Sequence, residues 1–286
     1  MFNPRLEAPI SDPIPTSGLQ RRISLASRLA PDGPCTLASL LRIELGGALD
    51  VDALNRSMFD LISQHEALRT TVSANGDMLL VWKTLGLALA ARDLPNVALE
   101  VENAVSEFRR KPFDLVAGPL VRVELMRLAV DRHLLVFAAH PIICDGWSLG
   151  VVGEDIASGY RTYARKTARE KISSSKIRDH LRAQSGLDTA YWRAMLNSPI
   201  PSLELPVDRA RNSNLPPRLE HAHRHIPLEL VHELQAMAGK HGASLFTTLS
   251  AAFSAQIAHL CKVEKVVLAI PAAGQLADGL ERVVGQ

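Results

Sequence analysis

The sequence has few cysteines and no long apolar run, and each shortage excludes a class of protein. The three cysteines, Cys35, Cys144 and Cys261, are odd in number and far apart, so they indicate neither a disulfide framework nor a cysteine zinc site. No apolar run reaches the roughly 18 residues that a membrane helix needs, and the N-terminus lacks the apolar segment of a signal peptide. These absences predict a cytoplasmic protein with reduced thiols and no membrane partner.

The chain also lacks an excess of charge of either sign. It carries 32 basic and 30 acidic residues, for a net charge of +2, and only 5% of its residues are aromatic. This balance, with no basic stripe interleaved with aromatics, argues against a nucleic-acid partner. The hydrophobic content of 47% over 286 residues is enough to bury one large core or two smaller ones. This composition predicts a globular protein.

The spacing of apolar residues predicts both strands and helices. Strands are predicted at 40–47, 120–129, 133–140, 221–228 and 265–270, with a hairpin formed by 68–72 and 78–83. Helices are predicted at 51–66, 97–110, 148–164, 189–196, 227–242 and 244–260. Asp50 is expected to cap the first of these helices, and the last is apolar enough to predict a buried position. Strands and helices mixed in this way favour a two-lobed α/β sandwich.

A polar stretch divides the chain into two parts. Residues 165–186 are charged and rich in serine, which is typical of a linker between lobes. We therefore expect an N-terminal lobe at residues 1–170, a linker at 171–186 and a second lobe at 187–286.

The segment most informative about function is LLVFAAHPIICDGWSLG, at residues 134–150. A buried strand is predicted to end at His140, and a helix to open after a short loop at Asp145. Active sites often place polar residues at such a junction between strand and loop. Taken alone, however, a histidine near an aspartate is more often a structural pair than a catalytic one.

The same segment resembles the HHxxxDG motif of the condensation domains of nonribosomal peptide synthetases, which share a fold with chloramphenicol acetyltransferase. The positions of the motif are, in order, His140, Pro141 in place of the second histidine, Asp145 and Gly146, followed by the family-like Trp147 and Ser148. Other stretches resemble this family in the same order: QHEALRTT at 64–71, which keeps Arg69, FDLVAGPLVRVEL at 113–125, AYWRAML at 190–196, LELPVDRAR at 203–211, and VVLAIPAAGQ at 266–275. The resemblance covers nearly the whole chain.

This resemblance implies a fold, a reaction and a set of partners. The fold would be the two-lobed chloramphenicol acetyltransferase-like sandwich, and the reaction would form an amide between a thioester donor and an amine acceptor. Peptidyl or acyl carrier proteins would present both substrates on phosphopantetheine, with no bound cofactor and no metal. Because the resembling domains continue beyond ERVVGQ, where this chain ends, the resemblance implies an incomplete C-terminal lobe.

The departure from the motif lies at Pro141, where the family keeps the histidine that acts on the amine. Proline has neither a titratable group nor an N–H donor. His140 is expected to point to the opposite side, because successive residues of an extended chain face opposite ways. We therefore expect an impaired condensation site with no catalytic residue intact. The alternatives are a non-catalytic recruitment module, a remnant without a function of its own, and a free-standing acyltransferase that uses a diffusible donor.

The remaining candidates have structural interpretations beside the functional ones. His140 is expected to be a hydrogen-bonded core histidine, and Asp145 to pair with an arginine such as Arg69, or else simply to cap a helix. Trp147 is expected to pack at the start of that helix, and Cys144 to be a small buried filler. Three alternating histidines, His221, His223 and His225, would share one face of a strand; a solvated face is favoured over a zinc site there.

Overall fold

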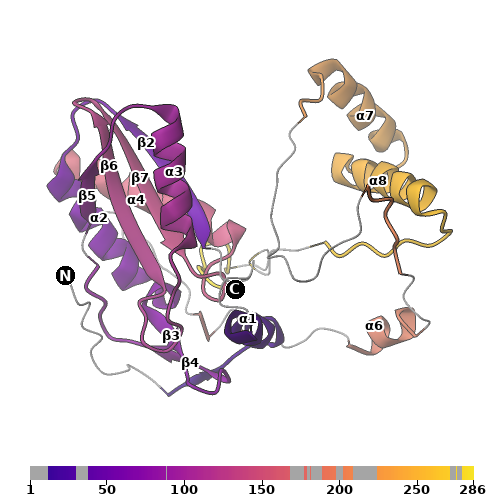
Figure 1. Cartoon of the computed structure of the whole chain (residues 1–286), viewed down its shortest axis with the longest axis horizontal. Helices are drawn as coiled ribbons and strands as arrows, with labels where there is room; N and C mark the ends of the chain where they lie inside the picture. The colour runs from indigo at the N-terminus through magenta and orange to yellow at the C-terminus, as the bar shows by residue number, and fades with distance from the viewer. Residues whose placement is uncertain are drawn as a thin grey trace. The chain divides into compact units, whose positions relative to one another are not determined.

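The protein is described by a computed structural model in which two units can be distinguished (Figure 1). The structure describes residues 12–29, 38–87, 89–167, 177–178, 181, 189–197, 202–208, 224–270, 275 and 279–286. Unit 1 comprises residues 1–186 and 273–286, and unit 2 comprises residues 187–272. Residues 273–286, the last segment of the chain, thus belong to unit 1, and the expected division into lobes at 1–170 and 187–286 with a linker at 171–186 stays a prediction.

The helices and strands follow one another in a mixed order. Unit 1 contains β1 (Ile14–Pro15), α1 (Gly18–Leu29), β2 (Ser39–Gly46), α2 (Val51–Gln64), η2 (Glu66–Arg69), β3 (Thr70–Val72), β4 (Met78–Val81), β5 (Ala90–Asp93), α3 (Ala98–Arg110), β6 (Val121–Ala129), β7 (Arg132–Ala139) and α4 (Gly146–Ala164). Unit 2 contains α6 (Thr189–Met195), α7 (Leu228–Lys240) and α8 (Leu245–Cys261). Most of the predicted elements of unit 1 are confirmed to within a few residues, whereas α1, β1 and β5 were not predicted.

A four-stranded mixed sheet in the order β2-β7-β6-β5 forms the centre of unit 1. β7 pairs antiparallel with both β2 and β6, and β5 adds a parallel edge to β6. The side chains of β7 alternate between two cores: Phe137 packs with the cluster that includes α2 and α4, and Val136 packs with the cluster that includes α3. The prediction that this strand is covered on both faces is thus confirmed.

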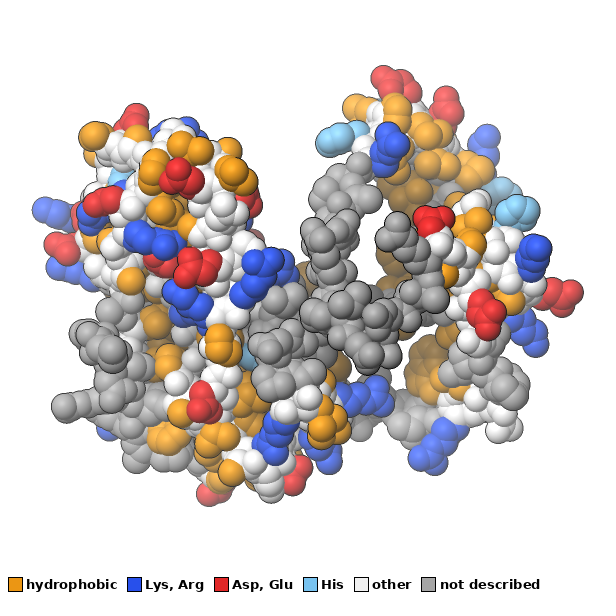
Figure 2. Space-filling view, viewed as in Figure 1, with side chains coloured by type: hydrophobic (Ala, Val, Ile, Leu, Met, Phe, Trp, Pro, Cys, Tyr) orange, Lys and Arg blue, Asp and Glu red, His pale blue; other side chains and the backbone are white. Residues whose placement is uncertain are grey.

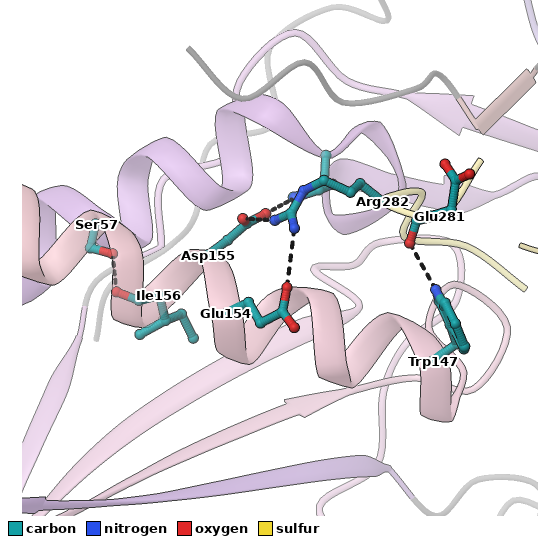
Figure 3. Close-up of polar contacts among 8 residues, drawn as sticks. Ser57, Trp147, Glu154, Asp155, Ile156, Glu281 and Arg282 are labelled. Carbon is teal, nitrogen blue, oxygen red and sulfur yellow. Dashed lines mark hydrogen bonds and ion pairs between the residues drawn. The ribbon is translucent and has the colours of Figure 1, made fainter. Parts of the chain in front are cut away.

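The packing of α2 against α4 sets the position of the helix that follows the motif loop. Ser57 Oγ of α2 donates a 2.9 Å hydrogen bond to the carbonyl of Ile156 in α4, as Figure 3 shows. Gly159 permits this close approach, since a Cβ built there would lie 2.5 Å from Ser57 Oγ. At its own start, α2 is capped as predicted, with Asp50 Oδ1 accepting from Ala53 N at 2.9 Å.

Unit 1 also contains a smaller antiparallel sheet in the order β1-β4-β3. The predicted hairpin is confirmed, with Gly76 at a positive φ of 86° in its turn, a conformation that glycine adopts without strain. α1 follows β1, and its buried Gln20 donates through Nε2 to the carbonyl of Ile142 at 3.1 Å. The loop that carries the motif is therefore held by a helix from the start of the chain.

Unit 2 corrects three of the sequence-based predictions. α8 was predicted to be buried, yet none of its residues is buried, and Phe246 and Phe253 are 59% and 56% exposed. Figure 2 shows hydrophobic side chains at the surface of this unit. Residues 265–270 form no strand. The described part of the predicted strand at 221–228 is 224–228, of which 224–227 form no strand and Leu228 begins α7. An apolar sequence becomes a buried helix or a paired strand only where another element covers it, and the main neighbour of α8 among the described elements is α7.

Two further expectations concern the linker and membrane spans. Of the predicted linker at 171–186 only residues 177–178 and 181 are described, and Ile177 is buried in the core of unit 1. Across the described ranges, no helix is both long and apolar enough to cross a bilayer.

Candidate active-site loop

The motif loop continues directly from the central strand. After β7 ends, the backbone N–H of His140 still donates to the carbonyl of Leu120 at 2.8 Å, which keeps His140 aligned with the start of β6. A turn over residues 141–143 then leads to Asp145, which caps α4. The loop is therefore fixed at one end by the sheet and at the other by the helix.

His140 is a core residue with a single tautomer favoured by its contacts. It is 1% exposed, and its Nδ1 accepts a 3.1 Å hydrogen bond from the backbone N–H of Ile142. Its ring meets Phe113 edge-on, with the centroids 5.9 Å apart. Burial, together with the positive charge of Arg122, lowers the pKa of His140 to about 4. The imidazole is therefore neutral near pH 7 and protonated on Nε2, and the prediction of a hydrogen-bonded core histidine is confirmed.

Pro141 stands at the position of the second histidine. It is half-buried, and its ring supplies no proton acceptor and no N–H donor. The neighbouring Cys144 does not substitute for a base or nucleophile, because burial and the nearby Asp145 raise the pKa of its thiol far above the usual range. Its side chain is fully buried, as predicted for a filler.

Asp145 acts as a helix cap and does not pair with Arg69. Its Oδ1 accepts from the backbone N–H of Ser148 at 2.8 Å and lies 2.6 Å from the Ser148 hydroxyl. The guanidinium of Arg69 instead donates to the carbonyl of Trp82, and its Nε is buried without a hydrogen-bond partner. The predicted pairing with Arg69 is therefore wrong. Arg69 lies directly before β3, and its guanidinium contacts Trp82, which directly follows β4, the partner strand of β3. The carboxylate of Asp145 instead contacts Ser148 in α4.

The cap is joined to the last residues of the chain by a buried polar cluster. Ser148 Oγ accepts from the backbone N–H of Gly285 at 3.0 Å, and Gln275 donates through Nε2 to Asp145 Oδ2 at 3.2 Å. Ser148 and Gln275 are fully buried. The sequence analysis placed Ser148 directly after the motif as a family-like residue. It did not single out Gln275, although Gln275 ends a stretch that resembles the family.

A second set of contacts along α4 was also missed. Trp147, 40% exposed at the start of the helix, donates through Nε1 to the carbonyl of Glu281 at 2.8 Å (Figure 3). Arg282 pairs with Glu154 at 3.1 Å and with the buried carboxylate of Asp155. One feature of the sequence pointed to this ion pair: Asp155 lies on the face of α4 that buries Val152 and Ile156. A buried carboxylate requires a partner.

Two of the pockets in the described part of unit 1 lie near these residues. One, of about 390 Å³, is lined by Glu154, Asp155, Arg161 and Arg282 along α4. The other, of about 250 Å³, lies between the end of α1 and the loop at 112–116, and His140 lines it. Pro141 lines neither pocket.

The structure shows no metal site among the residues it describes, in that no cluster of three or more His, Cys, Asp or Glu side chains is arranged to hold an ion. His225 is exposed and outside any strand, while His221 and His223 lie outside the described residues. The zinc alternative at these three histidines therefore stays a prediction.

Comparison with known proteins identifies the family of the chain. A family model described as "Condensation domain" matches residues 10–286. The chain is 30% identical over 303 residues to one polypeptide of the linear gramicidin synthase of Brevibacillus parabrevis, covering 96% of this chain and 6% of that protein. It is 29% identical over 302 residues to malpibaldin synthetase of Mortierella alpina, covering 96% and 5%. The chain belongs to the condensation-domain family.

Solved structures confirm the predicted α/β fold of the chloramphenicol acetyltransferase type. The X-domain from teicoplanin biosynthesis, solved in complex with OxyB, superposes with a TM-score of 0.80 at 22% identity and covers all of this chain. The first condensation domain of the calcium-dependent antibiotic synthetase superposes with a TM-score of 0.77 at 21% identity and covers 96%. The chain spans 66% and 68% of these two structures, and only a small part of the curated relatives.

Proposed function

We propose that this chain serves in a nonribosomal peptide or hybrid polyketide assembly line as a condensation domain whose amide-forming step is impaired. In that step an amine nitrogen attacks a thioester carbonyl, the C–N bond forms, the C–S bond breaks, and the phosphopantetheine thiol leaves as the amine loses a proton. Carrier proteins would present both substrates. The synthetase names of the relatives support this setting.

The observation that carries the proposal is the absence of an accessible base in the described motif loop. His140 is buried with its Nδ1 already accepting a hydrogen bond, Pro141 cannot accept a proton, and Asp145 is held by its cap. A positioned general base typically contributes about 10² to 10⁴ in rate. The reaction left without it would depend on the proximity of the two substrates.

The test is amide formation between a loaded donor carrier and a loaded acceptor carrier, followed by intact-protein mass spectrometry. The native chain is compared with Pro141→His, and with Pro95→His, which adds an imidazole at an exposed position in unit 1 far along the chain from the motif. If turnover rises only in Pro141→His, the result supports the proposal that the native chain keeps the fold of the site but lacks the catalytic base. Equal turnover in the native chain and Pro141→His contradicts the assignment of position 141 as the place of the base.

A second candidate function is a non-catalytic recruitment module of the same assembly lines. The observation that favours it is the similarity of fold to the X-domain, which was solved in complex with OxyB. This candidate predicts that neither the native chain nor Pro141→His forms amide, while the chain binds a carrier protein or an enzyme of the pathway. Calorimetric titration with loaded carrier protein measures that binding independently of turnover.

A further inference from the structure

The pocket beside His140 is a separate structural feature from the position of Pro141. Its walls come from Ser27 and Arg28 at the end of α1, from the loop at residues 112–116, which includes Asp114, and from His140 itself. Its volume of about 250 Å³ suits a small molecule, and most of the loop side chains that line it are apolar.

The polar groups at this pocket favour a hydrogen-bond acceptor. Because Nδ1 of His140 accepts from Ile142 N, the ring proton resides on Nε2, which is a donor. Among the described residues, the one side-chain hydrogen bond of His140 is the one at Nδ1, so Nε2–H has no protein partner there. His140 lines the pocket, so a ligand oxygen bound there would be in place to accept from this donor.

The charges around the pocket favour an anion over a neutral molecule. Arg28 lines the wall, and one 3.4 Å hydrogen bond to the carbonyl of Ser73 leaves most of its donors available. Arg122 lies with Cζ 3.9 Å from the centre of the Phe113 ring. The one carboxylate that lines the pocket, Asp114, accepts through Oδ1 from the backbone N–H groups of Val116 and Ala117, both at 2.9 Å, and these contacts offset part of its negative charge.

We propose that this pocket binds a small monocarboxylate, with Nε2–H of His140 donating to a carboxylate oxygen, Arg28 supplying the opposite charge, and the short apolar part of the ligand lying against Leu115 and Val116. The proposal does not depend on amide formation, so its test is a binding measurement that stands apart from turnover.

Butyrate is the probe, titrated into protein carrying ¹⁵N-labelled histidine while the Nε2 resonance of His140 is followed by NMR. His140→Asn assigns that resonance. We expect a saturable shift with a Kd on the order of 1 mM, the affinity range of a ligand with so few atoms. Butyramide keeps the acceptor without the charge and is expected to bind more weakly, and 1-butanol is expected to bind more weakly still.

Variants locate the binding. Val116→Trp, at a side chain that is 48% exposed on the rim, is expected to fill the pocket and remove the shift, whereas Val130→Trp, 98% exposed in the turn between β6 and β7, is expected to leave it unchanged. Arg28→Ala is expected to weaken butyrate and leave butyramide unaffected. The proposal is overturned by the absence of a saturable shift, by equal affinity for butyrate and 1-butanol, or by an undiminished shift in Val116→Trp.

Discussion

The imidazole Nε2 of His65 lies 2.7 Å from Oδ2 of Asp155, and the two side chains are only 1% and 2% exposed. His65 directly follows α2, whereas Asp155 lies on α4, and Arg282 reaches the same carboxylate from the end of the chain. A buried carboxylate is costly unless its oxygens are paired. These three residues therefore join α2, α4 and the last residues of the chain, on the helix that the motif residue Asp145 caps.

Removing the arginine of this group is expected to release the end of the chain. Arg282→Gln takes a charged donor away from Asp155 and Glu154, and we expect a loss of about 1.5 to 3 kcal/mol in the free energy of unfolding, the range for hydrogen bonds to charged groups. Urea denaturation measures this loss. Hydrogen exchange at the amides of Val283 and Gly285 is expected to accelerate, since both donate to partners in unit 1.

The matched controls for this variant are Arg282→Lys and Arg132→Gln. The lysine keeps a positive charge beside Asp155 and is expected to lose less stability. Arg132 makes only an exposed 3.5 Å contact with Asn96, so its replacement is expected to have little effect. Unchanged exchange at Val283 and Gly285 in Arg282→Gln would contradict the anchoring role.

Two glycines of α4 are expected to respond in opposite ways to the same substitution. Gly159→Ala places a Cβ 2.5 Å from Ser57 Oγ and 3.1 Å from Ser57 Cβ, so α2 and α4 must move apart. Overpacking of this kind costs about 1 to 3 kcal/mol. Gly150→Ala meets nothing within 4 Å and is expected to raise stability by up to about 1 kcal/mol through helix propensity.

Thermal or urea unfolding of the two variants provides the measurement. Adding Ser57→Ala to Gly159→Ala removes the closest atom and is expected to recover part of the loss, although the hydrogen bond from Ser57 to Ile156 is then absent as well. If Gly159→Ala were as stable as Gly150→Ala, the close contact between the two helices would be disproved.

The burial of His140 predicts a loss of stability in mild acid. Its pKa falls from 6.5 to about 4 on folding, so between those values the unfolded chain binds more protons than the folded one. The stabilisation is complete above pH 6.5 and is lost as the pH falls toward 4. The difference between the two pKa values corresponds to about 3 kcal/mol in the free energy of unfolding.

His140→Asn tests this prediction, because Asn retains an acceptor for the N–H of Ile142 and does not titrate in this range. We expect a flatter dependence of the unfolding free energy between pH 4 and pH 6.5 than in the native chain. His225→Asn, at an exposed position, is expected to keep the native dependence. Identical slopes in the native chain and His140→Asn would show that another group accounts for the loss in acid.

Local patterns in the sequence were sufficient to predict most of unit 1. The apolar run of β7, the hairpin turn at Gly76 and the cap at Asp50 were all confirmed, because each depends on residues adjacent in the chain. β5 was missed because only four residues form it, at the edge of the sheet. α8 was predicted to be buried from its composition, but burial depends on what packs against a helix, which composition does not contain.

The features of the motif loop, too, were predicted only in part from the sequence. The location of the motif at the junction between strand and helix, and the burial of His140, followed from local sequence. The partner of Asp145 did not follow from local sequence, because Arg69 is only one of many arginines in the chain. Gln275 and Arg282 were missed because their partners lie more than a hundred residues earlier in the chain.

The sequence by itself determined the family, the α/β fold and the replacement of the expected base by Pro141, because these depend on residue identity and on short-range periodicity. Only the tertiary structure decided that the end of the chain returns to unit 1 and that Asp155 is shared by His65 and Arg282. It also decided that His140 faces a pocket with an unpaired donor. Hydrogen bonds and ion pairs are short-range interactions, so which distant groups form them depends on how the folded chain brings them together.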